Sequence, residues 1–196
     1  MASTAKHPGG NVVYSSNVSY WQPATNLLTM TSAKYCNPES SSKVAVVILN
    51  KYSVSGLDAT KKITGFRLTT LCQRNSSETY SFRLVTGLSQ GKSSYTNIST
   101  AARSIADDGN YNQHERIIEV TDASSAEVVW MNNNIDKVIA GTDFGIRLYF
   151  KAIVWYAALE IFYTTPGGLY VGTSGASAVY RGTTKANVYL GTKKIM

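Results

Sequence analysis

The stretch FGIRLYFKAIVWYAALEIFYT, from Phe144 to Thr164, carries the pattern that decides the fold of this chain. Apolar residues recur with a period of two in Phe144–Ala152 and again in Val154–Thr164, and a β-strand turns successive side chains to opposite faces. Each half therefore predicts one strand. Glu160 interrupts the second run, and because an isolated buried carboxylate is costly, we expect it to point toward solvent or a neighbouring chain.

Further strand patterns lie on the amino-terminal side of this stretch: KVAVVILN (Lys43–Asn50), KITGFRLTTLC (Lys62–Cys72), TYSFRLVTG (Thr79–Gly87) and RIIEVTD (Arg116–Asp122). The first is almost continuously apolar, which predicts a strand covered on both faces. The second has Gly65 within it, which predicts a bulge or a kink. In the third, alternation places Arg83 on the face opposite Phe82.

Helix signals are few. Residues Ser99–Asp108 favour one short helical turn, and Asp122–Asn134 fits either a short helix or, because of Val128, Val129 and Trp130, a strand. Turn sequences rich in Gly, Asn and Ser separate the strands, and strands and helices do not alternate along the chain. The sequence therefore predicts an all-β fold, an antiparallel β-sandwich.

The composition narrows the classes of partner. The 196 residues carry a net charge of +7, but Lys and Arg are scattered and the aromatic residues lie in apolar runs, so we expect no specific nucleic-acid site. No apolar run reaches the roughly 20 residues that span a bilayer, and we expect no membrane insertion. The first residues, MASTAKHPGGNVVYSSN, lack the profile of a secretory signal, so we expect synthesis without a cleaved leader.

The inventory of reactive side chains is thin. The histidines, His7 and His114, stand far apart in sequence, and Glu160 has no obvious carboxylate partner for glycoside hydrolysis. No phosphate-binding glycine motif is present. We therefore expect no catalytic residues, no cofactor and no enzymatic activity, although a hydrolase with an unrecognised site is the remaining alternative.

Three features leave alternatives open. Asp107-Asp108, followed by Gly109-Asn110, fits a calcium-binding loop or a plain turn, and the turn is the preferred interpretation, with no metal site. Cys36 and Cys72 are either a disulfide or two semi-buried thiols. Tyr95 and Tyr111 lie in predicted loops, where they are either platforms for carbohydrate or ordinary surface packing.

The order of short motifs resembles the jelly-roll modules of tailed-bacteriophage structural proteins. The motifs that carry the resemblance are TGFRLTT, SFRLVTG, VVWMN, DFGIRLYF and LEIFYTT, in that order, after an opening segment SYWQPATNLLTMTSAKYC. The resemblance covers about residues 17–165 and implies a jelly-roll β-sandwich preceded by an amino-terminal arm, residues 1–16. It also implies a virion component located in the tail, neck or head fibre.

The last segment, residues 166–196, repeats a tyrosine followed by Gly-Thr two positions later. The repeated positions are Tyr170 with Gly172, Tyr180 with Gly182, and Tyr189 with Gly191. The spacing predicts one strand and one turn per unit, because glycine can adopt a positive φ. Serial units of this kind resemble short tails of virion proteins from phages and prophages of thick-walled bacteria. We expect an attachment or oligomerisation segment, with a flexible tail as the alternative.

These expectations combine into two functional hypotheses. The first is a non-enzymatic virion structural protein that assembles with copies of itself and with other virion proteins through its terminal segments. The second is a carbohydrate-binding or receptor-binding module that contacts host cell-wall polymer through loop aromatics such as Tyr95 and Tyr111.

Overall fold

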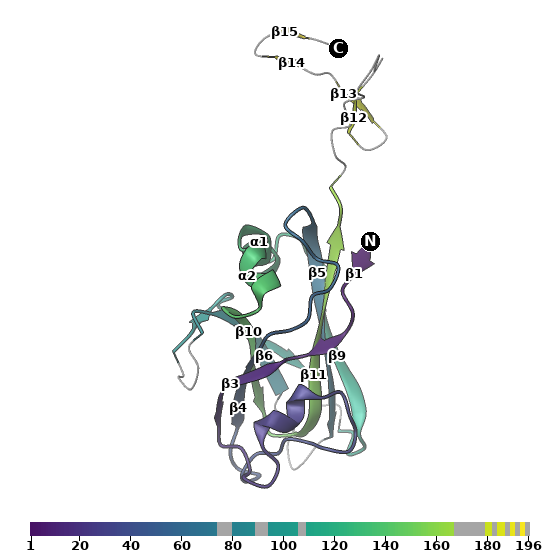
Figure 1. Cartoon of the computed structure of the whole chain (residues 1–196). Coiled ribbons are helices and arrows are strands. Elements are labelled where there is room, and N and C mark those ends of the chain that lie inside the picture. The colour runs from purple at the N-terminus through teal and green to yellow at the C-terminus, as the bar shows by residue number, and fades with distance from the viewer. Residues whose placement is uncertain are drawn as a thin grey trace. The chain divides into compact units, whose positions relative to one another are not determined.

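The computed structural model describes residues 1–73, 80–88, 94–105 and 109–166, together with the backbone of four short strands between residues 179 and 194. The chain divides into two compact units, Met1–Thr164 and Thr165–Met196. The elements of the first unit, shown in Figure 1, are β1 (Ala2–Ser3), β2 (His7–Pro8), β3 (Asn11–Ser16), the 3-10 helix η1 (Ala24–Leu28), β4 (Ala45–Asn50), β5 (Lys62–Gln73), β6 (Tyr80–Thr86), β7 (Thr96–Asn97), β8 (Arg103–Ile105), β9 (His114–Val120), α1 (Ala126–Asn133), α2 (Ile135–Ala140), β10 (Phe144–Phe150) and β11 (Ile153–Thr164).

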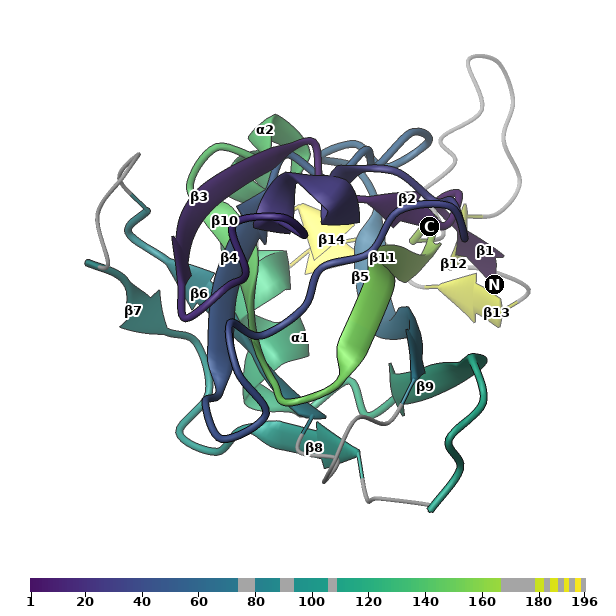
Figure 2. The same cartoon turned by 90° about the horizontal axis from the view of Figure 1, so that it is seen from below.

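The strands of this unit form two antiparallel sheets. The β5 sheet has the order β1-β11-β5-β9, with β2 also paired to β11, and the β10 sheet has the order β3-β4-β10-β6-β7, with β8 also paired to β6. Seen from below, β4, β6 and β10 lie on one side of the unit and β5, β9 and β11 on the other (Figure 2). From β4 to β11 the chain passes back and forth between the sheets, which is the connectivity of a jelly-roll β-sandwich.

The core lies between the two sheets. Phe82 of β6 and Phe66 of β5 meet edge to face there, with ring centroids 6.2 Å apart, and neither has exposed surface. Burial of a side chain of this size contributes about 1.5–3 kcal/mol to the free energy of unfolding. Alternation along β6 and β10 fills this core with Phe and Leu and turns Arg83 and Arg147 outward, as the sequence pattern predicts for Arg83.

The amino-terminal residues are part of the sandwich, so the prediction of a separate arm over residues 1–16 is wrong. Strands β1 and β2 pair with β11, and β3 pairs with β4. Thr4 is buried and exchanges hydrogen bonds with the Ile161 backbone, at 2.9 and 3.0 Å. An edge strand as long as β11 presents a row of unpaired backbone groups, and the first residues of the chain satisfy part of that row.

Of the two segments with helix signals, one forms a helix and the other contains a strand. The segment after Asp122 forms α1 and not a strand, because Ser125 caps it by accepting from the Val128 amide and because Val128 and Met131 reach the core. The helical turn predicted over Ser99–Asp108 is wrong: its described residues contain β8, which pairs with β6. Ladder hydrogen bonds to β6 outweigh the weak local helix signal.

Gly65 stands at the predicted bulge. The pairing of β5 with β11 shifts between Phe162 and Tyr163, opposite the step from Gly65 to Ile63. A Cβ atom at Gly65 would lie 2.3 Å from the carbonyl oxygen of Val120, so only glycine allows β5 to pass this close to the end of β9.

Cys36 and Cys72 lie on either side of Val154 and are not joined by a disulfide. Cys36 exchanges backbone hydrogen bonds with Val154, and Cys72 is the partner of Val154 on β5. Two strand spacings separate their Cα atoms by about 10 Å, beyond the roughly 4.4–6.8 Å that a disulfide spans. Burial raises the pKa of the Cys36 thiol to about 12, which keeps it protonated.

The second unit contains two small antiparallel hairpins, formed by β12 (Val179–Arg181) with β13 (Thr184–Ala186), and by β14 (Tyr189–Leu190) with β15 (Lys193–Lys194). Tyr180 and Tyr189 stand in the first strand of each pair, as the strand-and-turn pattern predicts. Gly182 and Gly191 fall between the paired strands in sequence and lie outside the described residues, as do Tyr170 and Gly172.

Candidate functional site

The most exposed aromatic residues of the described chain precede η1. Tyr20 is 86% exposed and Trp21 81% exposed, and their rings meet edge to face with centroids 5.3 Å apart. An aromatic side chain that stays exposed to water does not gain the stabilisation that burial would provide, about 1.5–3 kcal/mol for a side chain of this kind. Such a pair is therefore a candidate for contact with a ligand.

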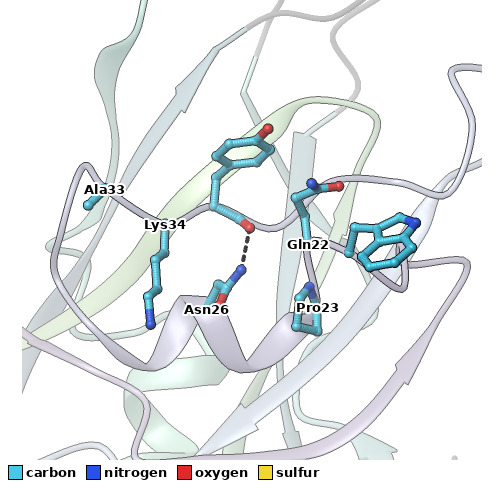
Figure 3. A pocket seen from close by; sticks show the side chains of 7 residues that line it. Gln22, Pro23, Asn26, Ala33 and Lys34 are labelled. Carbon is cyan, nitrogen blue, oxygen red and sulfur yellow. Dashed lines mark hydrogen bonds between the residues drawn. The ribbon is translucent and has the colours of Figure 1, made fainter.

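A hollow of about 310 Å³ opens beside Trp21, and we name it the Trp21 hollow. Its lining residues are Trp21, Gln22, Pro23, Asn26, Ala33, Lys34 and Tyr35. Gln22 and Pro23 lie on one side of it, Ala33 and Lys34 on the other, and Asn26 between them (Figure 3). The residues before and within η1 and the residues 33–35 that follow it thus form its walls.

Backbone pairing fixes these two walls. The Ser19 amide donates to Asn37 at 2.8 Å and the Asn37 amide to Gln22 at 3.3 Å, which makes residues 18–22 and 35–38 a short irregular ladder. Asn26 Nδ2 donates to the Tyr35 carbonyl at 2.8 Å, the dashed line of Figure 3. Leu27 has no exposed surface and anchors η1 in the core, and η1 also carries Asn26, a lining residue of the hollow.

A second hollow, of about 440 Å³, adjoins the first. It shares Asn26, Ala33 and Lys34 with the Trp21 hollow and adds the hydroxyls of Thr25, Thr29 and Thr31. Together the two hollows offer one exposed indole ring, amides, hydroxyls and one ammonium group. These groups can stack on a sugar ring and hydrogen bond to its hydroxyls.

The linings of the two hollows include no carboxylate, histidine or cysteine. Within the described ranges, no three His, Cys, Asp or Glu residues gather as metal ligands. Asp107 and Asp108, the alternative calcium ligands, lie outside those ranges. The polar groups that the two linings offer are amides, hydroxyls and the Lys34 ammonium.

The predicted tyrosines lie elsewhere. Tyr95 precedes β7 and is half-buried against Arg147, whose guanidinium carbon is 4.3 Å from the ring centroid. Tyr111 is 57% exposed in the segment that leads into β9 of the other sheet. Neither lines the Trp21 hollow.

Tyr20 and Trp21 were not predicted from the sequence to be contact residues. Their signal was two adjacent aromatic residues between Ser19 and Gln22-Pro23, in a segment without strand alternation. Tyr170, Gly172, Gly182 and Gly191 lie outside the described residues, and only the backbone of Tyr180 and Tyr189 is placed, so their predicted role in assembly stays a prediction.

No helix among the described residues is long and apolar enough to cross a membrane.

No protein-family model matches the sequence, and no curated protein matches it. Among solved structures, a chain of the crystal structure of reduced XRCC1 bound to the DNA pol beta catalytic domain is similar over 82% of this chain and 99% of its own, with 11% identity and a TM-score of 0.44. CBM35 from Paenibacillus barcinonensis is similar over 84% of this chain and 98% of its own, with 11% identity and a TM-score of 0.32. Likenesses of this size carry no inference about ligand or function.

Proposed function

We propose that this chain is a non-enzymatic structural protein of a tailed-bacteriophage virion, which displays the jelly roll and assembles through its carboxyl-terminal unit. The observation that carries the proposal is the pair of hairpins, β12 with β13 and β14 with β15, each beginning with a strand that contains a tyrosine of the repeat. The resemblance of the motif order and of the repeat to phage virion proteins supports the same role.

The size of these hairpins argues for a partner. Each pairs strands of two or three residues, and an isolated two-stranded hairpin is at best marginally stable in water. Hairpins this short become stable when another surface covers them or extends their edges. Identical hairpins on sister chains, or strands of other virion proteins, would supply that surface.

Light scattering coupled to size-exclusion chromatography tests the assembly role. We expect the intact chain to form a discrete oligomer at high concentration, and the double variant Tyr180→Ser/Tyr189→Ser to shift toward monomer. Tyr111→Ser, an exposed tyrosine of the sandwich, is the matched control and should leave the oligomer unchanged. A strictly monomeric intact chain, or an equal shift in the control, would count against self-assembly.

A second candidate function is favoured by the Trp21 hollow: binding of a neutral carbohydrate of the host cell wall. The exposed Tyr20–Trp21 pair and the adjoining amides and hydroxyls support it. A virion protein can carry such a surface as well as an assembly segment, so the two functions are compatible.

Co-sedimentation with purified cell walls of thick-walled bacteria tests this second function. We expect Tyr20→Ala/Trp21→Ala to weaken binding by about tenfold or more, the equivalent of about 1.4 kcal/mol. Tyr111→Ala is the matched aromatic control and should retain binding. Loss of binding in Tyr111→Ala alone would move the contact to that tyrosine, and absence of binding by the intact chain would remove this function.

A further inference from the structure

The outer face of the β10 sheet carries two arginines directly opposite each other. Arg147 on β10 pairs in register with Arg83 on β6, and on its other side with Ile48 on β4. Side chains at directly opposite positions have Cβ atoms about 4.5–5.5 Å apart. Two positive charges therefore share one row of the sheet, an arrangement that by itself destabilises the fold.

No carboxylate offsets these charges in the part of the chain that the structure describes. Neither guanidinium has a hydrogen bond or an ion pair there, and the Nε atoms of both arginines are buried without a partner. Burial first, and then the charge of Arg83, lower the pKa of Arg147. Buried donors without acceptors are costly, so an acceptor from outside the chain would stabilise this face.

Aromatic rings hold Arg147 in place. Its guanidinium carbon lies 4.2 Å from the Tyr149 ring centroid and 4.3 Å from that of Tyr95. A guanidinium whose face contacts aromatic rings can still donate hydrogen bonds from its Nη groups, and these are groups that bind a carboxylate or phosphate. The rings therefore fix the orientation of a donor group whose acceptor is missing from the described residues.

A hollow of about 310 Å³ lies beside Arg83 and beside Tyr149, the ring that contacts Arg147. It is lined by Val44, Ser81, Arg83, Ala102 and Tyr149. Ser81 and Tyr149 are in register on β6 and β10, one row from the two arginines on the same face. The hollow thus combines one guanidinium, two hydroxyl-bearing side chains and a small apolar floor, in a volume that accommodates a single sugar-sized unit.

We propose that Arg83 and Arg147 bind the anionic group of an acidic sugar unit, a carboxylate or a phosphate, with the unit seated in the hollow beside Arg83. Ser81 and Tyr149 supply hydrogen bonds to its hydroxyls. This site is separate from the Trp21 hollow, since the two share no lining residue, and it does not depend on the proposed assembly role.

Titration calorimetry on the full chain at low salt tests the proposal, with glucuronate, glucose 6-phosphate, inorganic phosphate and glucose as probes. We expect saturable binding of glucuronate or glucose 6-phosphate, at least about tenfold tighter than that of glucose, which corresponds to about 1.4 kcal/mol. Preference for one of the two acidic sugars identifies the anionic group. Binding of inorganic phosphate alone, equal binding of glucose, or no saturable binding would each overturn the proposal.

Variants locate the site. Arg83→Gln and Arg147→Gln should each weaken binding of the acidic sugar by about tenfold or more, while Arg67→Gln on the other sheet and Trp21→Ala should retain it. Arg83→Gln should keep or raise the unliganded melting temperature, since it relieves repulsion, and this separates loss of the site from loss of the fold. Binding that survives in both arginine variants, or that is lost in Trp21→Ala, would place the ligand elsewhere and refute the assignment.

Discussion

The outer faces of the two sheets use arginine in opposite ways. On the β5 sheet, Arg67 stands in one row between Glu119 and Glu160: its Nε donates to Glu119 at 2.7 Å, and its Nη1 lies 3.4 Å from Glu160. On the β10 sheet, Arg147 stands in one row between Ile48 and a second arginine, Arg83. Each arginine also lies against an aromatic ring, Phe162 for Arg67 and Tyr149 for Arg147.

The difference separates an arginine with carboxylate partners from two arginines that have none among the described residues. Arg67 is paired with two carboxylates, and Glu160 points outward into that row, as its position in the sequence predicts. The row through Arg147 keeps two guanidinium groups with buried, unpartnered Nε atoms among the described residues. A protein tolerates such a cost where a ligand removes it, so the β10 face is the one for which we propose binding.

The largest expected effect comes from giving Arg67 a cationic neighbour, as Arg147 has in Arg83. Glu160→Lys removes an attraction and places a cation opposite Arg67, and we expect the free energy of unfolding to fall by about 1–2 kcal/mol. Glu119→Lys should cost less, because the Glu119 side chain is 38% exposed and that of Glu160 only 18%. Urea denaturation of both variants measures the difference. Equal losses would show that burial does not set the strength of this row.

The reverse change is expected to be smaller. Arg83→Glu gives Arg147 a carboxylate neighbour, and we expect a gain of about 0.5–1 kcal/mol in the free energy of unfolding at neutral pH and low salt. Arg83→Gln, which removes repulsion without adding attraction, should give part of that gain. Salt should reduce both gains through screening. Destabilisation by Arg83→Glu would mean that the two arginines do not repel each other in the folded protein.

The smallest expected effect is the pH dependence that Glu115, on β9 of the β5 sheet, gives to the free energy of unfolding. The Lys6 ammonium, 2.7 Å away, and then the Tyr156 hydroxyl lower the pKa of Glu115. A carboxyl whose folded pKa is depressed stabilises the fold above its unfolded pKa of about 4.3, and that stabilisation is lost as the pH falls through the folded value. Since the Glu115 side chain is 44% exposed, we expect less than about 1 kcal/mol.

Stability curves at several pH values measure this effect. The difference in unfolding free energy between the natural chain and Glu115→Gln should be largest above about pH 5 and should decline as the pH falls below about 4.3 and through the lowered pKa of Glu115 in the folded protein. Arg147→Gln should leave the shape of the pH profile unchanged, because Arg147 has no carboxylate partner among the described residues. A profile altered by Arg147→Gln would reveal an acidic partner for that arginine.

Much of the sandwich was predictable from local patterns. The period of two located β6, β10 and β11, and Gly65 marked the bulge in β5. The predicted arm failed because the pairing of residues 2–16 depends on the exposed edges of β11 and β4, which no local pattern reveals. The helical turn over Ser99–Asp108 failed for the same reason, since β6 supplies the hydrogen bonds of β8.

The candidate sites were less predictable. Tyr95 and Tyr111 were predicted to be either carbohydrate platforms or ordinary surface packing because both lie in predicted loops, and Tyr95 is half-buried against Arg147. Tyr20 and Trp21 gained significance from the Trp21 hollow, whose second wall comes from residues 33–35. Surface exposure depends on which segments fold over a residue, and composition cannot supply that information.

Local sequence is enough to assign each side chain of a strand to one of its two faces. Alternation alone sends Arg83 outward, opposite the core residue Phe82, because a strand has a period of two. The neighbours that residues acquire across strands follow from the folded structure: Arg83 lies beside Arg147, Arg67 between two carboxylates, and Cys36 and Cys72 on either side of Val154. Register between strands distant in sequence is set by the packing of the whole core and the pairing of every edge, and these are properties of the complete fold.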